Sequence, residues 1–179
     1  MGKHTLHEYI GNLIDKEISD LPEVEVIKDP ACGGNQNIPL FCSKVKSNRT
    51  EYCNVDLLIL KDKKVKVIVE IEEANIKPTQ ICGKFLTSAL SSFFIHESGN
   101  NEPIGMDDSV LFVQFLDTSK LKIDKTSKIE QWANISKSIQ DIIPVKNSKI
   151  NSYKLFSGDV STLDNSSFVS SINEYLNPN

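Results

Sequence analysis

Two strand-like segments, joined by a short charged turn, set the strongest limit on the fold of this chain. Residues 55–60 form a nearly continuous apolar run, and valines recur at every second position over residues 65–69. The Lys61-Asp62-Lys63-Lys64 segment between them is typical of a four-residue β-hairpin turn. A hairpin makes its strands antiparallel neighbours, so the start of the first strand should lie beside the end of the second.

Helix and strand patterns elsewhere predict an α/β domain with a mixed sheet flanked by helices. Helices are expected over residues 4–19, from Pro78 to about Phe93, and over residues 125–143 and 168–176. Further strands are expected over residues 23–28, 40–45, 110–116 and 153–156, with a loop over 98–108. A chain of 179 residues is long enough for one domain with a substantial core. We therefore expect a single domain over residues 1–179, with a core of about 4–116 and a helical tail over 117–179.

The composition is that of an ordinary globular protein, with 39% hydrophobic and 25% charged residues. The net charge of −4 gives no overall attraction to nucleic acid or to an anionic membrane. No apolar run approaches the roughly 18–20 residues of a membrane span, and the first residues lack the apolar centre of a signal peptide. These observations predict a cytoplasmic protein with no membrane partner. The four cysteines form no CxxC pair, which favours reduced thiols over a structural zinc site.

Three carboxylates stand at the ends of the two hairpin strands. Asp56 lies at the start of the first, and Glu70 and Glu72 lie two residues apart near the end of the second. Residues two apart share one face of a strand, so the three side chains should converge at one end of the sheet. Converging carboxylates repel one another, and a hard divalent cation such as Mg²⁺ removes that cost. Bound Mg²⁺ activates water and stabilises charge on phosphoryl oxygens, which is the chemistry of phosphodiester cleavage.

Other interpretations of these carboxylates exist. Acidic residues at strand ends are often solvated rim charges, and Glu73 is expected to be one. Glycosidases also use paired carboxylates, but they usually need aromatic platforms for sugar, and only 7% of this chain is aromatic. Its single tryptophan, Trp132, fits the core face of a helix.

The pattern of Asp56, thirteen intervening residues and then Glu70-Ile71-Glu72 resembles the signature of the PD-(D/E)XK nucleases. That resemblance implies a restriction-endonuclease-like fold with an α-β-β-β-α-β core. It also implies Asp56 and Glu70 as ligands of Mg²⁺, for which Mn²⁺ can substitute, with the backbone carbonyl of Ile71 as a further ligand. Glu72 stands where the signature has lysine, as in the ExE variant of the motif, and is then a metal ligand itself.

The next helix offers a replacement for the missing lysine. Lys84 lies four residues after Gln80 on one helical face, which resembles an element of some family members; otherwise the pair is a solvated helix face. In this family a glutamate from the first helix often reaches the metal, and Glu8 is the expected candidate ahead of Glu17. Glu8 could instead complete a capping box with Thr5. His7 is expected to be a surface residue.

Two segments are candidates for holding nucleic acid. Glycines let backbone approach a phosphate, and asparagine or glutamine can read adenine edges, which favours the loop Gly34, Asn35, Gln36 and Asn37. Positive charge for phosphates could come from Lys44, Lys46 and Arg49. Gln80 is a further candidate. A flexible loop and solvated surface lysines are the alternative interpretations.

The sequence thus predicts a Mg²⁺-dependent endonuclease that hydrolyses phosphodiester bonds in double-stranded DNA, of the type II restriction class. Its catalytic residues would be Asp56, Glu70, Glu72 and Lys84. Cleavage of both strands with one site per chain would require a homodimer. The alternatives are a structure-selective or repair nuclease of the same fold, and a catalytically inactive nuclease-fold module that binds nucleic acid or a protein.

Overall fold

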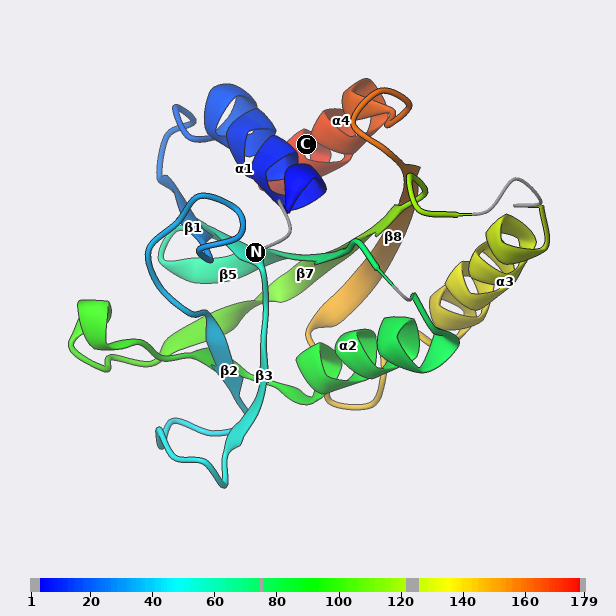
Figure 1. Cartoon of the computed structure of the whole chain (residues 1–179). Helices are drawn as coiled ribbons and strands as arrows, with labels where there is room; N and C mark the ends of the chain where they lie inside the picture. The colour runs from blue at the N-terminus through cyan, green and yellow to red at the C-terminus, as the bar shows by residue number, and fades with distance from the viewer. Residues whose placement is uncertain (1–3, 75, 122–125, 178–179) are drawn as a thin grey trace.

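The computed structural model describes residues 4–74, 76–121 and 126–177 (Figure 1). The helices in these residues are α1 (Thr5–Ile18), α2 (Pro78–Leu90), η1 (Glu97–Gly99, a 3₁₀ turn), α3 (Thr126–Ile142) and α4 (Asn165–Leu176). The strands are β1 (Val24–Lys28), β2 (Pro39–Phe41), β3 (Glu51–Asn54), β4 (Leu57–Lys61), β5 (Lys64–Glu72), β6 (Phe93–Phe94), β7 (Ile104–Asp117) and β8 (Ile150–Gly158). The expected mixed α/β architecture is confirmed at this level.

All eight strands belong to one mixed sheet in the order β1-β4-β5-β7-β6-β2-β3, with β8 pairing with β7 outside this path. The first three strands of that order run antiparallel to one another. Strand β7 runs parallel to β5, and β8 runs parallel to β7. The β5–α2–β7 segment is therefore a parallel crossover connection that follows directly after the hairpin.

The predicted hairpin is confirmed as the β4–β5 pair, in which Lys61 lies opposite Lys64. This pairing leaves a turn of two residues, Asp62 and Lys63. Both have positive φ values, of 51° and 60°. Two left-handed residues match the twist of the flanking strands. The same register places Leu57 opposite Val69, so Asp56 enters the sheet beside the end of β5.

Each face of the sheet carries its own hydrophobic core, which explains the near-continuous apolar runs. Leu58, Leu60 and Ile68 belong to the core shared with α2 and α3. Leu57, Ile59, Val67 and Val69 belong to the core shared with α1 and α4. Figure 1 shows α1 and α4 covering one side of the sheet and α2 and α3 lying on the other. None of the described helices is long and apolar enough to cross a membrane.

Several element boundaries differ from expectation. Helix α2 ends at Leu90, not near Phe93, because the backbone of Ser91 is extended and Phe93 pairs with Gly105 of β7. Strand β7 begins at Ile104, inside the segment expected to be a loop. Strand β3 was not predicted, since its four residues are mostly polar and exposed.

Residues 117–179 form more than a helical tail. Strand β8 pairs with β7 from Val110 to Asp117 and extends the sheet. Trp132 of α3 and Phe168 of α4 are buried in the two different cores. The C-terminal segment therefore completes both faces of the same sheet.

Candidate active site

Four charged side chains from three parts of the chain meet at one end of the sheet. Asp56 directly precedes β4, Glu70 and Glu72 lie at the end of β5, and Lys84 lies on α2. The Nζ atom of Lys84 is 2.6 Å from Oε2 of Glu70 and 3.2 Å from Oε1 of Glu72. It is also 3.8 Å from Oδ2 of Asp56. The structure thus brings together the four residues that the sequence singled out as catalytic.

Sheet geometry fixes the carboxylates. The period of two places Glu70 and Glu72 on the α2 side of β5, while the intervening Ile71 packs in the opposite core. The backbone N–H of Ile71 donates a hydrogen bond of 2.6 Å to Oδ2 of Asp56. This bond ties the aspartate to the neighbouring strand. That the carbonyl of Ile71 also binds metal stays a prediction.

The cluster has more negative than positive charge. Glu70 is completely buried, and Glu72 is 8% exposed. Burial, followed by the charge of Asp56, raises the pKa of Glu70 well above its usual value, although Lys84 opposes the shift. Burial by itself would lower the pKa of Lys84, but the carboxylates around it raise that pKa overall. One ammonium group therefore faces three acidic side chains.

Two carboxylate oxygens of this cluster lack a hydrogen-bond partner. Oε1 of Glu70 and Oε1 of Glu72 are buried and accept no hydrogen bond, even though the latter is within ion-pair distance of Lys84. Unsatisfied buried acceptors are costly, and excess negative charge adds to that cost. Carboxylate oxygens are the ligands that Mg²⁺ and Mn²⁺ prefer. In the described residues, however, Asp56, Glu70 and Glu72 are not a group whose ligand atoms all lie within 4.8 Å of one another.

The first helix contributes a histidine to this end of the sheet, not the predicted glutamate. Glu8 and Glu17 are exposed, and Glu17 pairs with Lys16. That Glu8 binds metal stays a prediction. His7 was expected at the surface, yet it is 7% exposed and its Nε2 atom lies 3.7 Å from Oδ2 of Asp56. The spacing of His7 with Ile10 and Ile14 on the buried face of α1 could have revealed this.

Glu73 is not the solvated rim charge that we expected. Its Oε1 atom accepts hydrogen bonds from the backbone N–H groups of Leu6, at 2.5 Å, and of His7, at 3.1 Å. The N-cap residue, His4, makes no side-chain capping bond, so Glu73 satisfies the start of α1 from a distant strand. Burial alone would raise the pKa of Glu73, but the hydrogen bonds from His7 and Leu6 lower this pKa overall.

Gln114 lies beneath the cluster and was not predicted as a site residue. It is fully buried on β7 directly beside Glu70. Its amide nitrogen donates to the carbonyl of Ile81 at 3.3 Å, and its carbonyl oxygen accepts from the hydroxyl of Tyr153 at 2.7 Å. These bonds join α2, β7 and β8 under the acidic residues. A glutamine inside the apolar run of residues 110–116 was the available signal.

The predicted nucleic-acid residues are spread over the surface. Gln80 serves the start of α2, because its side chain accepts from the backbone N–H of Lys77 at 3.0 Å. Lys44 lies 5.8 Å from the ring centre of Phe93, and Lys46 donates to Asn101 at 2.9 Å. Arg49 is exposed on the loop that leads into β3. Lys46 also pairs with Glu97 at 3.5 Å, and none of the described contacts joins these three basic residues to the acidic cluster at the sheet end.

The glycine-rich loop borders a cleft of about 580 Å³. Gly34, Asn35 and Gln36 line it opposite His96 and Ser98, whereas Asn37 is exposed outside it. Gly34 has a packing reason for lacking a side chain, since a Cβ atom would lie 1.8 Å from the carbonyl oxygen of Lys28. Its N–H donates to Asp29, so it is not directed at a ligand.

The loop is nevertheless anchored beside the acidic cluster. The backbone N–H of Asp29 donates to the carbonyl of Asp56 at 3.0 Å. Lys28, the residue before Asp29, lines the cleft, whereas the four residues of the acidic cluster do not.

No family model, curated protein or solved structure matches this chain.

Proposed function

We propose that this protein is a Mg²⁺-dependent endodeoxyribonuclease of the PD-(D/E)XK type. The observation that carries the proposal is the meeting of Asp56, Glu70, Glu72 and Lys84 at one sheet end, with two buried carboxylate oxygens lacking hydrogen bonds. Structural ion pairs rarely leave such acceptors unsatisfied.

The order of elements supports the same proposal. Helix α1 is followed by the antiparallel strands β1, β4 and β5, then by α2 and the parallel strand β7. This succession resembles the α-β-β-β-α-β core that the sequence resemblance implies, with the β2–β3 pair inserted between β1 and β4.

In this proposal the carboxylates bind and orient, and the lysine stabilises charge. Asp56, Glu70 and Glu72 would hold the cation, and Ile71 keeps Asp56 directed at it through its backbone N–H. The cation supplies Lewis-acid activation of water and charge stabilisation at the phosphate. Lys84 brings a permanent positive charge to the place where negative charge develops on the phosphoryl oxygens.

The substrate and the assembly follow from the chemistry. Double-stranded DNA cut by a type II restriction enzyme needs two such sites, so the active form would be a homodimer. The cleft beside the loop of residues 33–37 is the proposed surface for base recognition, through the amide side chains of Asn35 and Gln36. A structure-selective repair nuclease would use the same chemistry on branched substrates.

The direct test is cleavage of supercoiled, linear and branched DNA in Mg²⁺ and then in Mn²⁺. We expect cleavage by the wild type and a loss of at least about a hundredfold in Asp56→Asn, since the cation contributes several kcal/mol to such reactions. Glu130→Gln, an exposed carboxylate change on α3, is the matched control and should retain activity. Discrete fragments from linear DNA would favour restriction, and selective cleavage of branched DNA would favour repair.

One observation favours the inactive module as the second candidate. The ammonium group of Lys84 by itself neutralises part of the charge of the acidic cluster, so the cluster does not need a metal ion for that part. If neither metal supports cleavage and calorimetry detects no binding of either metal, the catalytic proposal fails and this second candidate takes its place.

A further inference from the structure

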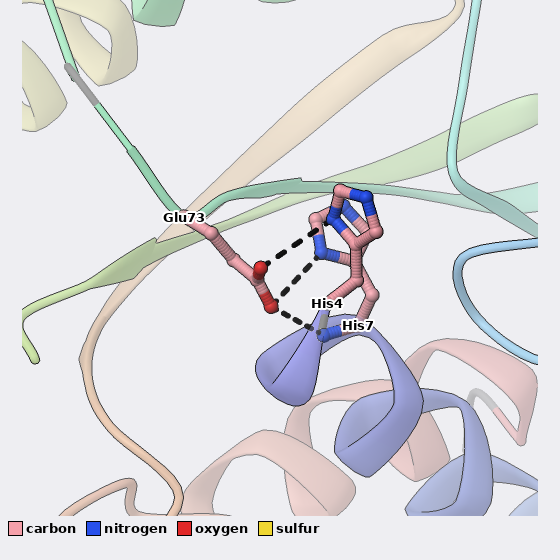
Figure 2. A group of neighbouring side chains, drawn as sticks. All are labelled: His4, His7 and Glu73. Carbon is pink, nitrogen blue, oxygen red and sulfur yellow. Dashed lines mark hydrogen bonds and ion pairs between the residues drawn. The ribbon is translucent and has the colours of Figure 1, made fainter. Parts of the chain in front are cut away.

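A second cluster of potential metal ligands lies beside the acidic one, and the proposed nuclease chemistry does not use it. His4 is the N-cap of α1 and His7 lies on its first turn, three residues on, and both face Glu73 after the end of β5 (Figure 2). One ligand atom from each of the three residues can be chosen so that all lie within 4.8 Å of one another. Among the His, Cys, Asp and Glu side chains of the described residues, these three form the group that meets this distance criterion.

The spacing of the donor atoms matches a small transition-metal ion. Nδ1 of His7 is 3.2 Å from Oε1 of Glu73, and Nδ1 of His4 is 3.5 Å from Oε2. Metal–ligand bonds of about 2.0–2.1 Å in a tetrahedron place the ligands about 3.3–3.4 Å apart. Both nitrogen–oxygen distances are close to this separation, although each ends on a different oxygen of Glu73.

A buried nitrogen without a hydrogen bond points to the same place. The side chain of His7 is 9% exposed, and its Nδ1 atom has no hydrogen-bond partner although a carboxylate oxygen is close. A bound cation would satisfy this nitrogen, whereas without one it is a buried polar atom at a cost.

The outer contacts also fit a metal-ligating histidine. Such histidines usually direct their second ring nitrogen at a carboxylate, which orients the ring. Nε2 of His7 lies 3.7 Å from Oδ2 of Asp56. Glu73 is held in turn by the backbone N–H groups of Leu6 and His7. His4 is 63% exposed at its side chain, so a fourth coordination position would open to solvent.

From this geometry we propose that His4, His7 and Glu73 form a binding site for a divalent transition metal of the zinc class. Two imidazoles among three ligands favour Zn²⁺, Co²⁺ or Ni²⁺ over Mg²⁺, which prefers oxygen. The site joins the start of α1 to the end of β5 and would fix the His7 ring beside Asp56. It does not depend on the nuclease proposal, because none of its three ligands belongs to the acidic cluster.

The test is calorimetric titration of the chelator-treated full chain with Zn²⁺, together with visible absorption of the Co²⁺ form. We expect one tight site per chain and the absorption of tetrahedral cobalt with nitrogen and oxygen ligands. His4→Ala should weaken Zn²⁺ binding by at least about tenfold, because removing a ligand should lower the metal affinity more than removing an outer-shell partner does. His96→Ala removes the only histidine outside the cluster and should leave binding unchanged.

Two further variants separate this site from the others. Glu70→Gln disables the acidic cluster and should leave Co²⁺ binding intact, and Cys82→Ser removes the exposed thiol with the same expectation. Zn²⁺ should also raise the melting temperature of the wild type more than that of His4→Ala. Absence of tight Zn²⁺ binding, thiolate-type cobalt absorption, or equal affinity in wild type and His4→Ala would overturn the proposal.

Discussion

At the scale of single residues, Lys84 determines the balance of charge at the acidic sheet end. Its ammonium group lies within 3.8 Å of all three carboxylates. Removing it leaves the buried Glu70 close to Asp56 without a positive charge between them. Both the stability of the fold and its response to cations should therefore depend on this side chain.

Lys84→Met should lower the free energy of unfolding by about 1–3 kcal/mol at neutral pH, because buried carboxylates lose their partner. The loss should shrink as the pH falls, since protonation of the carboxylates removes their repulsion. Mg²⁺ should restore more stability to the variant than to the wild type, because the ammonium group no longer competes for the same oxygens. Thermal unfolding with and without Mg²⁺ measures this, and an unchanged melting temperature in Mg²⁺ would count against the cation site.

The sequence predicted the residues of the acidic cluster and missed those around it, for a physical reason. Asp56, Glu70 and Glu72 are placed by strand period and a hairpin, which are short-range rules. Lys84 follows from the position of one helix. His7 and Glu73 meet across 66 residues, and their contact depends on how α1 docks against the sheet end. Local patterns do not encode that docking, so the contact of His7 with Glu73 was not predicted, although the helical spacing of His7 could have indicated its burial.

At the scale of elements, a partly buried ion pair joins β5 to β7 at the end opposite the acidic cluster. Nζ of Lys66 is 2.6 Å from Oδ2 of Asp107, and Lys66 is 9% exposed. The bond from Lys66 lowers the pKa of Asp107 in spite of partial burial. This pair fixes the beginning of the parallel register.

Asp107→Asn should cost about 1 kcal/mol at pH 7, the net worth of a partly screened charged hydrogen bond. A carboxyl group whose pKa is lowered by folding contributes stability above its unfolded pKa of 3.8, and that contribution is lost as the pH falls below it. The difference between wild type and variant should therefore disappear in acid. Urea titrations at pH 7 and near pH 3 check this; a difference that grows in acid would contradict it.

The hairpin turn is strained at Lys63, whose φ is 60°. Lys63→Gly should raise the free energy of unfolding by up to about 1 kcal/mol, because glycine adopts this conformation without a Cβ clash. Lys64→Gly is the matched control and should be destabilising, since Lys64 begins β5 in extended conformation. Urea unfolding of both variants measures the two effects, and equal destabilisation would argue against the two-residue turn.

At the scale of the whole molecule, the C-terminal third of the chain completes the sheet and its two cores. The prediction of a mixed α/β domain was correct because periodic patterns identified most elements. The strand expected over residues 153–156 is confirmed as part of β8. The description of a helical tail was incomplete, because the half-exposed faces of this strand gave a weak signal for its full length and for its place in the sheet. The burial of β8 alternates irregularly, and its membership in the sheet follows from the long partner strand β7.

A chain truncated after Asp117 should fail to fold cooperatively. It would lose β8 from the edge of β7 and uncover both cores, which include Trp132 on one side and Phe168 on the other. Circular dichroism and thermal unfolding of the truncated chain test this. A cooperative transition like that of the full chain would show that residues 4–117 are a self-sufficient domain.

The capping of α1 by Glu73 has a consequence for synthesis of the protein. The helix leaves the ribosome long before residue 73, so in the nascent chain its first backbone N–H groups lack the carboxylate that satisfies them in the finished fold. An isolated helix of 14 residues is marginal in water. Helix α1 should therefore dock and become ordered only once the β4–β5 hairpin and Glu73 have emerged.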